Sequence, residues 1–225
     1  MSSESPLVRV PIFPLENVVL FPRVSVPLHI FEPRYRQMTR DALDSERCIG
    51  MAVARPDQVE AMQQQPALFE VGCMGRIEHA EELPGGRFNI LLEGTTRFRI
   101  ETEDPPDSER LYRVAHVRTL DDGEHEGDSP QVQTLRGEVR DLMRQLLSIV
   151  APNRVELFEQ QPILQLDDEA FVNTMSQSLD FVSSEKQALL EANSVRERYE
   201  RLTTFMRFRL AELSSGSTSG SGTVQ

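Results

Sequence analysis

The chain has 225 residues, and 24 Lys and Arg against 36 Asp and Glu give it a formal net charge of −12 at pH 7. Apolar residues make up 39% of the sequence, which is enough for a buried core and excludes wholesale disorder. No run approaches the ~20 consecutive apolar residues of a membrane span, and the polar start lacks the pattern of a secretory signal. A charge this negative disfavours nucleic acid as a partner. We therefore expect a cytoplasmic protein with no membrane association.

The first half of the sequence has the pattern of a β domain with a single helix. Apolar, β-branched runs bounded by Pro and Gly predict strands. These runs are Val8–Ile12, Val18–Phe21, Val24–Phe31, Cys48–Ala54, Leu68–His79, Arg87–Glu93, Arg97–Ile100 and Tyr112–Leu120. The one helical pattern is Pro33–Asp44, where Tyr35, Met38 and Ala42 recur on one face. Many short strands favour a compact barrel over a parallel sheet.

A short acidic segment follows the predicted strands. Residues 101–131 hold ten acids and three bases, together with Pro and Gly, which is typical of solvated loops. We predict that residues 121–130 form an acidic linker between a barrel subdomain, 1–120, and a helical bundle, 131–213. The Ser- and Gly-rich residues 214–225 are predicted to form a disordered tail.

The second half is helical in pattern throughout. Ser129-Pro130 is a good N-cap and first-turn pair, and it predicts a helix to about Val150. Capping boxes at Ser184 and Ser194 predict two further helix starts, the last helix ending near Leu213. The apolar stripes are too short for a stable coiled coil, so we expect them to pack within one small bundle.

Local motifs for catalysis are missing from the sequence. The single lysine, Lys186, is not part of a P-loop, and there is no G-x-G-x-x-G, H-E-x-x-H or G-x-S-x-G. The cysteines Cys48 and Cys73 have no metal-ligand spacing with each other or with histidine. His29 lies in an apolar run and is predicted to be structural. We therefore predict a protein that is not an enzyme, with no cofactor and no metal site.

Several segments together resemble one family. P-I-F-P-L-E-N-V-V-L-F-P at 11–22, followed by V-P-L-H-I-F-E-P-R-Y at 26–35, is similar to the signature of the N-terminal, substrate-binding domain of the Lon protease family. The similarity continues through later blocks, at Cys48–Val53, Val71–Ile77, Leu83–Ile90, Gly94–Ile100 and Glu185–Glu191. It spans about residues 8 to 210.

The resemblance implies an α+β fold, a PUA-like β barrel followed by a C-terminal helical bundle. It also implies a non-catalytic role in protein quality control, the binding of unfolded or client proteins, here without the ATPase and peptidase domains of the full protease. An adaptor role beside a separate ATP-dependent protease is compatible with this. The alternative is an RNA-binding module, because other PUA-like barrels bind RNA. The low aromatic content, and a basic stripe limited to Arg34, Arg36 and Arg40, argue against it.

Strand alternation suggests where a client would bind. In the run 26–31, Val26, Leu28 and Ile30 form a core face, so His29 and Phe31 are predicted to point outward. A strand that is apolar on both faces is either sandwiched between two layers or presents one face to a partner. We hypothesise that Phe13 and Phe31 form an exposed apolar patch for unfolded segments. Glu32, Arg34 and Tyr35, which fall inside the signature, complete the predicted protein-binding site.

Overall fold

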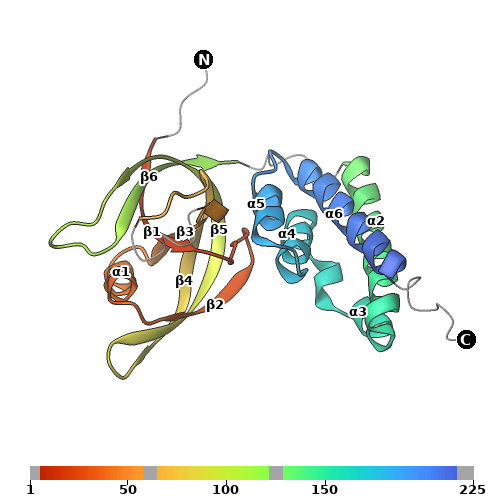
Figure 1. The fold of residues 1–225 in the computed structure, drawn as a ribbon, viewed down its shortest axis with the longest axis horizontal. Helices are drawn as coiled ribbons and strands as arrows, with labels where there is room; N and C mark the ends of the chain where they lie inside the picture. Colours follow the sequence, from red (N-terminus) through yellow and green to blue (C-terminus); the bar gives the residue numbers. More distant parts are fainter. Residues whose placement is uncertain (1–5, 58–64, 122–128, 217–225) are drawn as a thin grey trace, which may run out of the picture. The chain divides into compact units, whose positions relative to one another are not determined.

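The computed structural model describes residues 6–57, 65–121 and 129–216 (Figure 1). Contacts between residues divide the chain into two compact units. The first unit comprises residues 1–121 and 176–191, and the second comprises residues 122–175 and 192–225. Most of the acidic linker predicted at 121–130, residues 122–128, lies outside the described residues, and so do residues 217–225 of the predicted tail.

The first unit is built on six strands in one mixed sheet. They are β1 (Val8–Leu15), β2 (Ser25–Ile30), β3 (Cys48–Val53), β4 (Val71–Leu83), β5 (Arg87–Asp104) and β6 (Arg113–Leu120). The order is β2-β5-β4-β3-β1-β6, and a further pairing of β5 with β6 closes five of the strands into a barrel. Among the strands of the described residues, β1 with β3 is the one parallel pair. The predicted α+β class is confirmed.

The long strand β5 holds the barrel together because it pairs along both of its edges. Its first half pairs with β2, from Ser25 opposite Glu93 to Ile30 opposite Phe88. Its second half pairs with β6 along the same edge, while β4 pairs along the other. The closed barrel surrounds an apolar core, which comprises Val10, Ile12, Ala52, Ala54, Leu68, Met74, Phe98, Ala115 and Val117.

Two strand predictions were wrong for one shared reason. The runs Arg87–Glu93 and Arg97–Ile100 belong to the single strand β5. The run Val18–Phe21, in which Val19, Leu20 and Phe21 are buried, is not a strand. The chain after Val18 crosses β5 at Gly94, where a Cβ would lie 2.1 Å from the carbonyl oxygen of Phe21. Gly94 therefore permits a close backbone crossing and does not end the strand.

Helix α1 (Pro33–Leu43) forms as predicted, with Tyr35, Met38 and Ala42 on its buried face. Arg36 attaches this helix to the turn between β4 and β5, because its Nε donates to the carbonyl oxygen of Gly86 at 2.8 Å. In Figure 1 the β4–β5 hairpin extends beside α1.

Helix α5 (Ser183–Leu190) belongs to the first unit, although the sequence groups it with the helical half. Gln187 donates to the carbonyl oxygen of Val71 at 2.9 Å, and Arg97 donates to that of Leu190 at 2.8 Å. The capping box predicted at Ser184 is wrong. The N-cap is Val182, two residues earlier, and the Glu185 carboxylate accepts the amide of Val182 at 3.0 Å.

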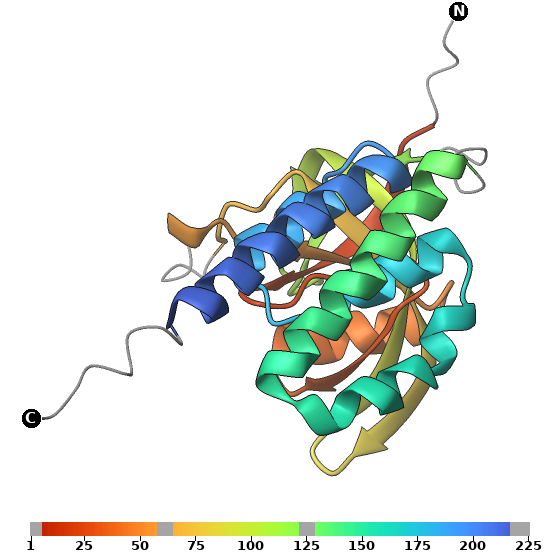
Figure 2. The same ribbon diagram turned by 90° about the vertical axis from the view of Figure 1, so that its right-hand side faces the viewer.

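The second unit is helical. It holds α2 (Pro130–Val150), a 3-10 turn at Pro152–Arg154, α3 (Val155–Glu159), a second 3-10 turn at Pro162–Gln165, most of α4 (Asp168–Ser178), and α6 (Val195–Gly216). Helix α2 packs against α6 (Figure 2). Glu138 forms an ion pair with Arg207 across the two helices.

The predicted helix starts at Ser129 and Ser194 are confirmed. The Ser129 hydroxyl accepts the amide of Val132 at 3.2 Å, and the Ser194 hydroxyl accepts that of Glu197 at 3.2 Å. Helix α2 ends at Val150 as predicted, whereas α6 runs to Gly216, three residues beyond the predicted end. A buried polar cluster supports this unit, because the carboxylate of Asp168 accepts from Gln133 and Arg136, each at 2.7 Å.

Candidate functional site

A hollow of about 350 Å³ opens in the first unit where the end of β1, the end of β2 and the start of α1 meet. Ligand pockets in proteins commonly measure ~300–1,000 Å³, so this one can hold a few side chains. Its lining comprises Phe13, Pro14, Leu15, Glu16, Asn17, Val18, Leu28, His29, Ile30, Phe31, Glu32, Arg34 and Tyr35. The structure thus brings all five of the predicted site residues to one place.

Two aromatic rings form the floor of this hollow. The ring centroids of Phe13 and Tyr35 lie 4.5 Å apart, and both side chains are buried, with exposed fractions of 5% and 4%. The prediction that Phe13 stands exposed is wrong, because its ring packs against the buried face of α1. Burial raises the pKa of Tyr35 to about 12, so its hydroxyl is neutral at pH 7.

The outer wall of the hollow is Phe31, which is 60% exposed, as the strand alternation predicted. Its ring stacks at 6.1 Å on that of His29, whose Nδ1 lies 2.8 Å from the Oδ1 of Asn89. His29 is exposed, so it belongs to the rim of the hollow and not to the core. An exposed aromatic above a buried aromatic floor offers a surface on which an apolar side chain can be buried.

A charged pair forms another part of the rim. Arg34 donates from Nε to the Oε2 of Glu32 at 3.0 Å, and its guanidinium lies 4.5 Å from the centroid of the Tyr35 ring. Arg36, four residues after Glu32, bonds instead to the backbone of Gly86. The Glu32 carboxylate is thus neutralised by its neighbour, and the Arg34 guanidinium is fixed over the ring.

Several residues of the hollow were not predicted as site residues. They lie in the segment Pro14–Val18 and at Leu28, His29 and Ile30. The segment is part of the signature block, which was a usable signal, whereas Leu28 was assigned to the core face and is in fact only half-buried. Asn17 in this segment is held from α5, since its side-chain oxygen lies 3.1 Å from the hydroxyl of Ser183.

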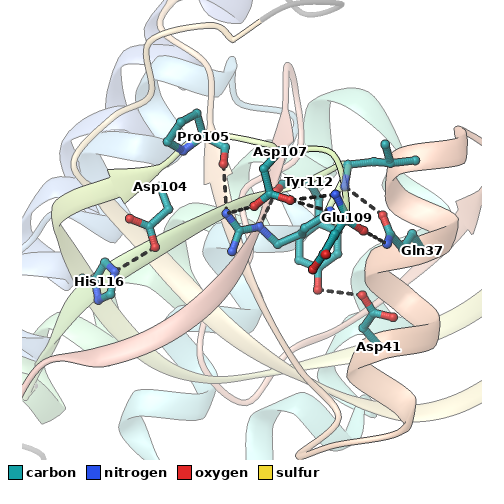
Figure 3. A network of polar contacts seen from close by, with 10 residues as sticks. Gln37, Asp41, Asp104, Pro105, Asp107, Glu109, Tyr112 and His116 are labelled. Carbon is teal, nitrogen blue, oxygen red and sulfur yellow. Dashed lines mark hydrogen bonds and ion pairs between the residues drawn. The ribbon is translucent and has the colours of Figure 1, made fainter.

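A polar network fixes α1, and hence Arg34 and Tyr35, to the connection between β5 and β6 (Figure 3). Tyr112 donates its hydroxyl to the carboxylate of Asp41 at 2.8 Å, and Gln37 bonds to the backbone of Glu109 and Leu111. The network ties two segments that are distant in sequence, so the helix that forms one wall of the hollow is anchored to the barrel.

The other hollow and the reactive side chains outside this site give less support for a functional site. A second hollow, of about 500 Å³, lies near Arg9, Asp41 and Cys48, but burial raises the pKa of the Cys48 thiol and so disfavours the reactive thiolate. The Nζ of Lys186 donates to the carbonyl oxygen of Gln177 at 2.8 Å. Among the described residues, no group of three or more His, Cys, Asp and Glu side chains is placed to hold a metal ion.

No helix in the described part of the chain combines the length and apolar character needed to cross a membrane.

Comparison with known proteins places the chain in a family. The family described as the ATP-dependent protease La (LON) substrate-binding domain matches residues 9–207. The Lon protease of Flavobacterium johnsoniae is 25% identical over 214 residues, which cover 95% of this chain and 26% of that protein. The Lon protease of Parabacteroides distasonis is 28% identical over 215 residues, which cover 91% of this chain and 24% of that protein. The chain thus spans about a quarter of the length of these relatives.

Solved structures show the same fold. A Lon N-terminal domain protein from Xanthomonas campestris superposes with a TM-score of 0.64 at 22% identity, covering 88% of this chain and 99% of that one. The N-terminal domain of a Mycobacterium avium complex Lon protease gives a TM-score of 0.64 at 18% identity, covering 89% and 98%. With the family match over residues 9–207, the conclusion is that this chain belongs to the family of LON substrate-binding domains.

Proposed function

We propose that this chain is a non-catalytic, cytoplasmic protein-binding domain that captures unfolded segments of client proteins in the hollow at Phe13 and Phe31. The observation that carries the proposal is the convergence of the five predicted residues on one hollow with an apolar floor and an exposed aromatic wall. Membership of a substrate-binding family supports the same function.

The chemistry of the hollow suits an apolar side chain of a client. Its floor is aromatic and aliphatic, and the pair of Glu32 with Arg34 leaves little net charge at that part of the rim. Folded proteins bury most of their large apolar side chains, whereas unfolded chains expose them. A site of this kind therefore favours unfolded segments over native surfaces.

The basic side chains that could serve RNA binding have protein partners. Arg34 pairs with Glu32, Arg36 donates to the backbone of Gly86, and Arg40 lies 3.9 Å from Glu82. With a net charge of −12, these contacts give the RNA alternative less support than protein binding. A client held in this way could be passed to a separate ATP-dependent protease, which gives the domain the role of an adaptor.

Two equally exposed phenylalanines provide a matched test. Phe31 in the hollow and Phe208 on α6 are both 60% exposed. Removing an apolar contact worth about 1.5–3 kcal/mol weakens binding about 10- to 150-fold. We expect Phe31→Ser to weaken binding of a fluorescently labelled, denatured casein by that factor in an anisotropy titration, with Phe208→Ser close to wild type. Equal affinities for all three proteins would contradict the proposed site.

A further inference from the structure

Among the described residues, one edge of the strand β2 has no strand partner. There β2 pairs with β5 alone, from Ser25 to Ile30. The carbonyl oxygen of Val24, just before the strand, accepts the amide of Gly94 at 2.9 Å, so the backbone of Val24 faces β5. Along a strand, the backbone N–H and C=O groups of successive residues point to opposite edges. The backbone groups of Ser25, Pro27 and His29 therefore point away from β5. Pro27 has no amide hydrogen to donate, which fits an open edge.

The end of β1 has an open edge as well. β1 pairs with β3 as far as Leu15, but with β6 only as far as Ile12. The carbonyl oxygen of Leu15 accepts the amide of Ala54 at 3.0 Å, so Leu15 faces β3. By the same alternation, Pro14 and Glu16 direct their backbone groups away from β3. Each of the two open edges thus contains a proline, which has no amide hydrogen to donate to a further strand.

The hollow lies where these two edges end, because Pro14, Glu16 and His29 all line it. One edge of β5 pairs with β2 along its first half and with β6 along its second half. In the second half, β6 also pairs with β1 and so bridges β5 and β1. In the first half, no strand of the described residues lies between β2 and the end of β1. The barrel therefore has a seam at the hollow.

We propose that a client segment binds at this seam as an added β-strand, pairing its backbone with the open edge of β2 and placing alternate side chains into the hollow. This inference rests on the proposed function and specifies how the segment is held. Strand addition draws affinity from main-chain hydrogen bonds and specificity from pockets for alternate side chains. It therefore accepts many different sequences, provided that the segment is extended.

The charge of the rim selects among such segments. Glu16 is exposed, and no cation pairs with it in the part of the chain that the structure describes, whereas Glu32 is paired with Arg34. The chain as a whole carries −12. The occupant that fits is an extended segment in which apolar residues alternate with Lys or Arg, so that apolar side chains enter the hollow and a basic one meets the Glu16 carboxylate.

Backbone methylation of a peptide tests strand addition separately from side-chain capture. The probe is a short peptide that alternates Leu and Phe with Lys, made unmodified and with N-methyl groups on either its odd or its even amides. A strand donates to one neighbour only through every second amide, so one methylated series should lose about tenfold or more in affinity while the other stays near the unmodified peptide. Isothermal titration with the full chain measures all three.

Each outcome has a distinct meaning. Strand addition is supported if only one methylated series loses affinity. It also requires that the bound peptide slow the amide hydrogen exchange of His29 and leave that of Ile30, which is already paired with β5, unchanged. Equal affinities for both series would overturn strand addition and leave the proposed function standing. No binding of the unmodified peptide, with denatured casein still bound, would overturn the preferred segment chemistry. A dimer of the chain that the peptide dissociates would assign the open edge to a second copy and overturn the inference.

Discussion

The ring of Tyr35 packs on that of Phe13 with a centroid separation of 4.5 Å and an interplanar angle of 57°. This tilted contact joins the first helix to the first strand, and it is the floor of the hollow. It makes the two phenylalanines of the candidate site unequal, since Phe13 belongs to the core of the protein and Phe31 to its surface.

Alanine substitution should separate these two roles. Phe13→Ala removes a buried ring and should lower the free energy of unfolding by about 3–5 kcal/mol. Phe31→Ala removes an exposed ring and should change it by no more than about 0.5 kcal/mol. Urea denaturation followed by circular dichroism measures both. Similar midpoints for the two variants would contradict the burial of Phe13.

The hydroxyl of Tyr35 should be dispensable for stability at neutral pH. It is buried without a hydrogen-bond partner among the described residues, so Tyr35→Phe removes a desolvated polar atom and should leave stability equal or higher. Tyr112 is the matched control, because its hydroxyl donates to Asp41 at 2.8 Å. Tyr112→Phe should lower the free energy of unfolding by about 0.5–1.5 kcal/mol. The reverse order of the two variants in thermal melts would contradict this account.

Ionisation of the same hydroxyl should lower the stability of the protein at alkaline pH. Burial raises the pKa of Tyr35 to about 12, against about 10 in the unfolded chain. The unfolded state therefore loses this proton first. The contribution of the neutral Tyr35 hydroxyl to the free energy of unfolding is therefore fully present below pH 10. It is lost as the pH rises from 10 towards 12, by on the order of 2–3 kcal/mol.

Tyr35→Phe should flatten that loss without abolishing it. Burial and the bond to Asp41 raise the pKa of Tyr112 to about 12 as well, so part of the decline remains. The measurement is the free energy of unfolding of both proteins at several pH values from 9 to about 11.5. Parallel curves for wild type and variant would show that Tyr35 does not contribute.

The polar cluster of the second unit should be sensitive to the loss of one partner. The Asp168 carboxylate is 6% exposed and pairs with Arg136, which lies 4.4 Å from the centroid of the Phe171 ring. Asp168→Ala leaves the Arg136 charge unpaired and should lower stability by about 3–5 kcal/mol. Adding Arg136→Met should restore much of the loss, because no buried charge is then left alone.

Glu159 provides the control for this variant. It pairs with Arg140 and Arg144 at the surface of the same unit. Exposed ion pairs contribute little because water and salt screen them, so Glu159→Ala should leave the melting temperature almost unchanged. An effect of Asp168→Ala as small as that of Glu159→Ala would contradict the buried pair.

Local patterns in the sequence were sufficient to predict much of the fold. The helix at Pro33, the N-caps at Ser129 and Ser194 and the outward position of Phe31 all depend on residues within one or two turns of each other. The motif at 11–35 supplied the site residues as a set. What remained hidden depends on contacts between distant segments.

Gly94 illustrates the limit. In the sequence a glycine between two apolar runs indicates a break, and only the crossing of the chain at Phe21 shows that it serves close approach. The place of α5 is a similar case, because its attachment depends on Arg97 and Val71, about a hundred positions earlier. The burial of Phe13 likewise depends on a partner in another element.

The attachment of α5 to the barrel has a consequence for synthesis on the ribosome. All six strands have been made by Leu120, whereas the helix that accepts from Arg97 and donates to Val71 is complete only at Leu190. Translation adds about 5–20 residues per second, so the nascent barrel waits several seconds without this helix. During that interval the Arg97 guanidinium and the Val71 carbonyl lack these native partners, and the emerging chain is itself an unfolded segment of the kind that quality control must recognise.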